Sequence, residues 1–133
     1  GMDEATIRQY DLTANEVAIF HSSISPIRLY ELAKLYFAPG ALTLDVGCGV
    51  GRDCNWLLNN GFPTYGVDAS RQMLLKARYG YPHLQLILDS RLRGNDGLST
   101  GVIAVNDAKS SKICWIHKRG VPKPKNHPNK GFP

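Results

Sequence analysis

Residues 41–51 are the most informative part of the sequence and read ALTLDVGCGVG. The first six form a short, largely apolar run without regular alternation, which is typical of an inner strand of a parallel sheet, buried on both faces. Three glycines then follow within five residues: Gly47, Gly49 and Gly51. Glycines of this kind allow a tight turn and let the backbone approach a ligand closely, although many purely structural turns also carry two of them.

The chain beyond this loop alternates between helical and strand patterns. Helices are expected over residues 51–60 and 70–80, and strands over 64–67 and 84–88. Gly61 stands where the glycine that ends a helix belongs, and Ser70 stands where a helix N-cap belongs. This alternation predicts an α/β fold with a partial parallel sheet and right-handed crossovers.

Three aspartates fall at or next to the ends of the three predicted strands: Asp45, Asp68 and Asp89. The carboxyl ends of parallel strands meet at one edge of a sheet, where ligands of such folds bind. We therefore expect an acidic rim there. An acid at the end of the second strand can accept hydrogen bonds from both hydroxyls of a ribose.

Two helices are expected before the first strand. Residues 13–16 read TANE, which has the form of a capping box, and an apolar run follows to Phe20. The second helix begins at Pro26, and its apolar residues recur with helical spacing as far as Phe37. Residues 1–40 therefore predict an N-terminal helical cap.

The glycine loop admits two classes of ligand. A dinucleotide fingerprint would place its third glycine at position 52, where this chain has Arg52. A pyrophosphate about 6 Å from a charged Asp45 would also be repelled by roughly 2–3 kcal/mol at an effective dielectric constant near 20. S-adenosylmethionine carries an ammonium and a sulfonium and no phosphate, so it would be attracted instead. An NAD-type nucleotide-binding fragment stays an alternative.

Residues 42–52, 66–70 and 86–90 resemble the motifs at the first three strands of the class I S-adenosylmethionine-dependent methyltransferases. The resemblance covers about residues 10–90 and includes the helix after the second motif, with Met73 and Ala77. It implies a Rossmann-like methyltransferase core and S-adenosylmethionine as cofactor. It also implies S-adenosylhomocysteine as product and a small-molecule methyl acceptor that the sequence does not identify.

The resemblance also implies a set of cofactor-binding residues, whereas no catalytic residue can be assigned. The loop would hold the methionine part, with Asp45 nearby and Cys48 contributing only its backbone. Asp68 would bind the ribose. Ala69 and Met73 would flank the adenine, and Asp89 would reach its amino group. Tyr10 would close over the cofactor. The full set of implied cofactor-binding residues is Tyr10, Asp45, Gly47, Cys48, Gly49, Gly51, Asp68, Ala69, Met73 and Asp89.

The pattern changes near residue 90. Residues 91–133 contain nine Lys or Arg and two Asp or Glu, whereas residues 1–90 contain seven and nine. The family sheet has seven strands, yet residues 101–105 and 112–117 are separated by room for a hairpin turn only. We therefore expect a family N-terminal half joined to an unrelated tail by truncation or frameshift. Its activity is then in question, and a non-catalytic, S-adenosylmethionine-binding or oligomerising remnant is the alternative.

Three segments follow: a cap over 1–40, a partial core over 41–90 and a basic tail over 91–133 with a hairpin at 101–118. The first strand of the core would be central in the family but lacks a neighbour here. An unpaired apolar strand edge promotes association. We therefore expect either a homodimer through that edge or tail strands added to the sheet.

Composition bears on location and on other partners. No apolar run reaches the about 18 residues of a membrane span, and three cysteines without a CxxC pair suit reduced thiols in the cytoplasm. No cluster has the spacing of a metal site. The basic tail, with Trp115 among its lysines, could form a nucleic-acid surface. A solvated tail without that role is the favoured interpretation.

Overall fold

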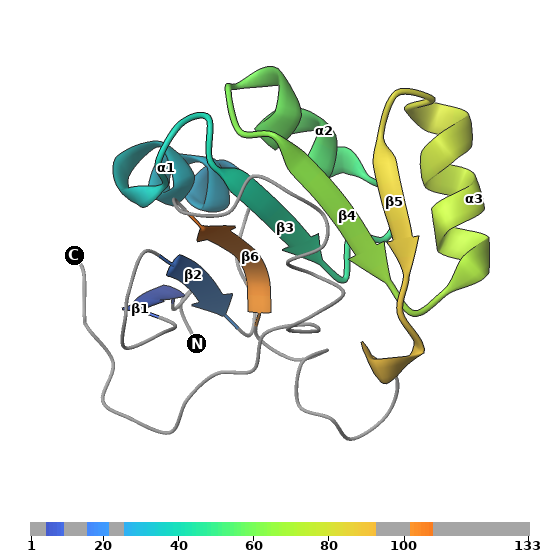
Figure 1. The fold of residues 1–133 in the computed structure, drawn as a ribbon, viewed down its shortest axis with the longest axis horizontal. Helices are drawn as coiled ribbons and strands as arrows, with labels where there is room; N and C mark the ends of the chain where they lie inside the picture. Colours follow the sequence, from blue (N-terminus) through green and yellow to red (C-terminus); the bar gives the residue numbers. More distant parts are fainter. Residues whose placement is uncertain (1–4, 10–15, 22–25, 93–101, 108–133) are drawn as a thin grey trace.

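A computed structural model describes residues 5–9, 16–21, 26–92 and 102–107 of the chain. They form one six-stranded sheet in the order β1-β2-β6-β3-β4-β5, with three α-helices (Figure 1). The elements are β1 Ala5–Gln9, β2 Glu16–His21, α1 Pro26–Tyr36, β3 Leu42–Val46, α2 Arg52–Asn59, β4 Thr64–Asp68, α3 Arg71–Gly80, β5 Gln85–Leu88, the 3-10 helix η1 Ser90–Leu92 and β6 Val102–Asp107.

The predicted α/β alternation is confirmed. β3 pairs with β4 and β4 with β5, both in parallel, and α2 and α3 connect them. The helix signals read from the sequence act as expected. The Ser70 side chain accepts a hydrogen bond from the Met73 N–H, and Gly61 takes a φ of 92° just after α2.

The N-terminal cap differs from the prediction, because the helix expected over residues 13–20 is wrong. Residues 16–21 form strand β2, which pairs antiparallel with β1 on one side and β6 on the other. Val17 and Ile19 alternate onto the core, where Ile19 is fully buried. Such β-branched residues suit a pleated, half-buried surface. The capping-box pattern of residues 13–16 is local, and the pairing with β6 overrides it.

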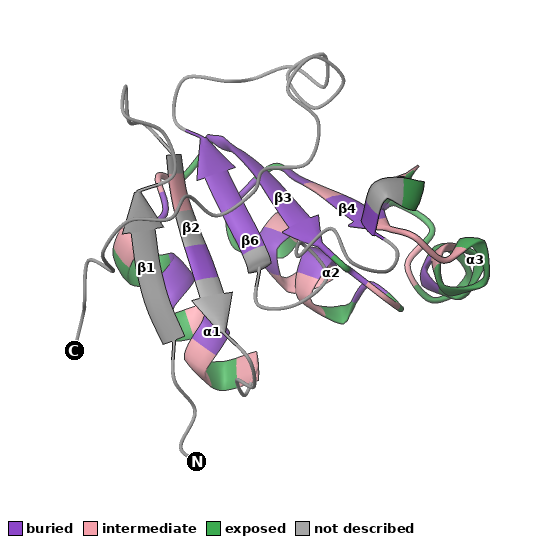
Figure 2. Ribbon diagram, turned by 90° about the horizontal axis from the view of Figure 1, so that it is seen from below, coloured by how far each residue is buried: buried purple, intermediate pink, exposed green. Residues whose placement is uncertain are grey.

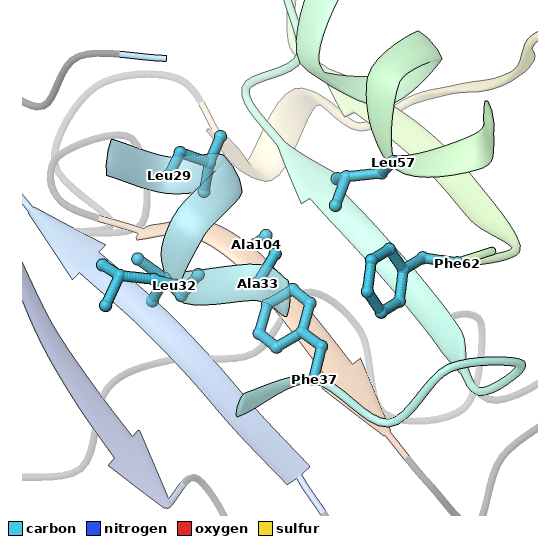
Figure 3. Close-up of a cluster of buried hydrophobic side chains, with 8 residues drawn as sticks. Leu29, Leu32, Ala33, Phe37, Leu57, Phe62 and Ala104 are labelled. Carbon is cyan, nitrogen blue, oxygen red and sulfur yellow. The ribbon is translucent and has the colours of Figure 1, made fainter. Parts of the chain in front are cut away.

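The predicted second helix is confirmed as α1, and it carries the main hydrophobic core. Its buried face meets residues of α2 and of the sheet (Figure 3). The Phe37 and Phe62 rings meet edge to face with their centroids 5.9 Å apart. Tyr30 of α1 stacks on Trp56 of α2 with the ring centroids 4.1 Å apart. The buried cluster comprises Ile19, Leu29, Leu32, Ala33, Phe37, Leu57, Phe62 and Ala104.

Strand β6 fills the place beside β3 that the sequence left open. It runs antiparallel to both β2 and β3, and Figure 2 shows β3 and the described part of β6 as buried. The expected addition of a tail strand to the sheet is thus confirmed for Val102–Asp107. The edge of β3 is paired, so it offers no site for the expected homodimer. β6 also has no free edge for a hairpin partner at 112–117, a stretch outside the described residues.

The side chain of Asn106 fixes β6 in register. It is 1% exposed and reaches the turn between α1 and β3. Its Oδ1 accepts from the Ala38 N–H at 2.8 Å, and its Nδ2 donates to Thr43 Oγ1 at 2.8 Å and to the Ala38 carbonyl at 3.2 Å. One buried amide therefore satisfies several polar groups that would otherwise be stranded in the core.

Gly51 is required where the start of α2 lies against Ala77 of α3 and Leu84. Its φ is 90°, and a Cβ there would lie 2.7 Å from Leu84 Cδ1 and 3.2 Å from Ala77 Cβ. A side chain at this position would therefore strain the backbone and also overpack the contact.

A search of the described helices for one that is both long enough and apolar enough to span a membrane finds none.

Replacing Asn106 by alanine should lower the free energy of unfolding by about 2–4 kcal/mol, because buried donors and acceptors lose their partner. Urea denaturation measures the change. The control is Asn60→Ala, since the side chain of Asn60 is exposed and donates to the Trp56 carbonyl at 2.7 Å. That variant should lose less than about 1 kcal/mol. Equal losses in the two variants would contradict the role given to Asn106.

Gly51→Ala and Gly61→Ala form a matched pair, because both residues have a φ near 90° and only Gly51 is crowded. Both variants should suffer the backbone penalty of a left-handed alanine. Gly51→Ala should be less stable than Gly61→Ala by about 1–3 kcal/mol from overpacking. Thermal unfolding of the two variants measures the difference. Equal melting temperatures would contradict the contact of Gly51 with Ala77 and Leu84.

Candidate functional site

The glycine loop lies open at the carboxyl end of β3. The N–H groups of Gly47 and Cys48 both donate to the Val67 carbonyl, at 2.7 and 2.9 Å, which anchors the loop to the end of β4. Gly47 and Gly49 have φ values of 73° and 54°, and a Cβ on either would meet no atom within 4 Å. Their left-handed backbone therefore borders free space, which a ligand can occupy.

Asp68 joins this loop to the next β–α connection. Its Oδ2 accepts from the Gly49 N–H and its Oδ1 from the Ser70 N–H, both at 2.8 Å. These two bonds fix the orientation of the carboxylate at the end of β4. Each carboxylate oxygen has a second lone pair, and the residue is only half-buried, so further donors can be accepted.

Asp45 lies near the rim but is buried, which opposes the charge expected there. It pairs with Gly66, two residues before the end of β4, and it is 3% exposed. Burial raises the pKa of Asp45 well above its ordinary value, and the nearby Asp53 raises it further. This favours the neutral acid, because desolvation penalises the charged form. The expected repulsion between Asp45 and a pyrophosphate is correspondingly weakened.

The remaining acidic residue lies close to Asp68. Asp89 follows β5, is 8% exposed and donates its N–H to the Asp68 carbonyl at 3.0 Å. Ala69 is half-buried, and Met73 in the first turn of α3 is 40% exposed. The structure thus places the predicted ribose and adenine residues around one end of β4. Tyr10 lies outside the described residues, and its role stays a prediction.

The two cysteines near the loop are packing residues. Cys48 Sγ occupies the space over Gly66, where a Cβ would lie 2.8 Å from it. Burial raises the pKa of the Cys48 and Cys54 thiols, so both remain protonated and poorly nucleophilic. No group of three His, Cys, Asp or Glu residues in the described ranges could hold a metal ion.

Two further residues beside the glycine loop, Tyr30 and Asp53, carry no signal in the sequence. The Tyr30 hydroxyl donates to Asp53 Oδ1 at 2.8 Å, and Arg52 Nε lies 3.1 Å from the same oxygen. Burial, together with the bond to Asp53, raises the pKa of Tyr30 to about 12. This contact ties α1 to the first turn of α2, directly after the glycine loop. It joins residues 23 positions apart, so no local pattern indicates it.

The carboxyl rim of the sheet also receives a strand from the opposite direction. β3, β4 and β5 end there, whereas the antiparallel β6 begins beside the end of β3, with Ala104 opposite Asp45. β5 therefore ends, and β6 begins, at the rim that carries the glycine loop. A parallel fourth strand would instead begin at the far end of the sheet.

Comparison with known families agrees with this geometry. Residues 44–101 match the family described as a methyltransferase domain, whereas no curated protein matches the chain. The matched range contains the glycine loop, Asp68 and Asp89, and it ends just before β6. The match over residues 44–101 supports a class I S-adenosylmethionine-dependent methyltransferase domain in this part of the chain, and the α/β sheet fits the Rossmann-like core of that family.

Proposed function

We propose that this chain binds S-adenosylmethionine beside the glycine loop and passes its methyl group to a small-molecule acceptor, leaving S-adenosylhomocysteine. One observation carries the proposal. The Asp68 carboxylate is held by the Gly49 and Ser70 N–H groups at the junction of the open loop and the start of α3. A fixed acceptor in this place suits a ribose with two hydroxyls.

The residues at the site fit the cofactor. The space before Gly47 and Gly49 is free, and a ligand carboxylate can take hydrogen bonds from the loop at the start of α2. Asp68 would bind the ribose, and Asp89 would accept from the adenine amino group. Ala69 and the partly exposed Met73 would flank the adenine. Gly51 and Cys48 would shape the loop, and Tyr10 would close over the cofactor.

The chemistry proposed for the protein is positioning. S-adenosylmethionine supplies an electrophilic methyl group on its sulfonium. The residues around the loop hold and align the reactants, which is the main requirement of a direct displacement. The Cys48 and Cys54 thiols stay protonated, and so does Tyr30, whose hydroxyl donates to Asp53. None of these three groups serves as a base at neutral pH.

A specific observation favours a second candidate, a non-catalytic remnant that binds S-adenosylmethionine. Where the family sheet has a parallel fourth strand leading to acceptor-facing loops, this chain has the antiparallel β6. The third candidate, an NAD-type fragment, gains from the neutral Asp45 but still has Arg52 in place of the third glycine of a dinucleotide motif.

Partners and location complete the proposal. A homodimer through a sheet edge would use β1 or β5, the outer strands of the described sheet, and Leu88 of β5 is half exposed. We retain a cytoplasmic location from the reduced cysteines. A nucleic-acid role for the basic residues beyond 107 remains the disfavoured alternative.

Asp68→Ala should weaken S-adenosylmethionine binding about 100-fold, because it removes acceptors for the ribose and the support of the Gly49 N–H. Isothermal titration calorimetry with S-adenosylmethionine and with NAD measures this. Glu31→Gln is the control, since Glu31 is an exposed acid on α1 paired with Arg28 at 3.7 Å, and binding should be unchanged. Wild-type affinity in Asp68→Ala, or binding of NAD alone, would contradict the proposal.

A further inference from the structure

One carboxyl oxygen near the glycine loop is buried without any hydrogen-bond partner. It is Oδ2 of Asp45, and no other buried side-chain oxygen or nitrogen in the described residues lacks a partner. Asp45 lies on β3 opposite Gly66 and Ala104, and only 3% of it is exposed. A charged carboxylate in this position would lack both water and a full set of donors, which is strongly unfavourable.

The groups facing Asp45 add to this cost. Asp53 of α2 and Asp68 of β4 both act on it as like charges, and the Cys54 backbone N–H is the hydrogen bond that opposes them. Arg52 is the one cation among the groups acting on Asp45 in the described chain, and it is engaged with Asp53 at 3.1 Å. A negative charge on Asp45 would therefore face two other carboxyl groups with a single guanidinium among them, which favours the neutral form of Asp45.

The other groups around Asp45 bring no compensating charge. The Cys48 and Cys54 thiols are neutral, and Tyr30 reaches the cluster only by donating its hydroxyl to Asp53. The strand on the other side contributes Ala104. The missing element is therefore a positive charge, and the open space beside Gly47 and Gly49 is where one can enter.

We propose that Asp45 keeps a proton on its carboxyl group while the crevice is empty and releases it to the solvent when a cation binds beside the glycine loop. Asp45 would then be the residue that distinguishes ligands by charge. The identity of the cation rests on the proposed function, in which S-adenosylmethionine is the ligand. Because the proton leaves on binding, affinity for a cationic ligand rises with pH until Asp45 is already ionised.

Proton release on ligand binding is tested by calorimetric titration of the protein with S-adenosylmethionine near neutral pH. The titration is run in phosphate and in Tris, two buffers that differ in their enthalpy of ionisation. The dependence of the observed enthalpy on buffer gives the number of protons released. The wild type should release up to about one proton, and Asp45→Asn should release none. Asp107→Asn is the matched control, because Asp107 is a buried acid at the opposite end of the sheet, and its release should equal the wild type.

S-adenosylhomocysteine separates charge from mere occupancy, because it lacks the sulfonium. It should release a smaller fraction of a proton than S-adenosylmethionine. Equal release by the two ligands, or the same release from Asp45→Asn as from the wild type, would overturn the inference while leaving the proposed function intact. Absence of S-adenosylmethionine binding would overturn the proposed function and the ligand-linked release together.

The empty protein is tested separately, without any ligand. The pKa of Asp45 is raised in the folded state, so its contribution to stability is complete below the unfolded value near 4 and declines as pH rises. Asp45→Asn cannot ionise. Its urea midpoint relative to the wild type should therefore increase as the pH rises from about 5 to about 8. A constant difference for Asp45→Asn across this range would overturn the claim that Asp45 holds a proton.

Discussion

The antiparallel pairing of β6 with β3 is the contact on which the rest of the sheet depends. β3 is buried along its whole length, and it can be so only with a strand on each side. β6 supplies the second side and at the same time joins β1 and β2 to the core. Asn106 makes this placement specific, because its amide fits the polar groups of the turn between α1 and β3.

A rigid β3 in turn positions the site. The glycine loop leaves the end of this strand, and its N–H groups bond to Val67 and to the Asp68 carboxylate. The same burial that orders β3 removes Asp45 from water and leaves one of its oxygens without a partner. Packing and electrostatics at the site therefore have a common origin, because the burial that orders β3 also favours the neutral form of Asp45.

The sequence predicts the elements whose signals are local. The β3-α2-β4-α3-β5 series follows from apolar runs, caps and helix-ending glycines that act within a few residues. The site residues of the loop and of β4 follow from the same motifs. The helix predicted over residues 13–20 is wrong because pairing of β2 with β6 outweighs the local pattern. The bonds of Asn106 and the bond of Tyr30 to Asp53 span 63–68 and 23 positions, and the depth of Asp45 depends on α2 above it. No local pattern encodes these distances.

Backbone hydrogen exchange of residues 102–107, followed by mass spectrometry or NMR, tests the placement of β6 most directly. An inner strand bonded on both sides exchanges only when the surrounding sheet opens. The amides of β6 should therefore exchange as slowly as those of β3 and β4. Exchange of residues 102–107 at the rate of an unstructured peptide, while β3 and β4 remain protected, would contradict the account.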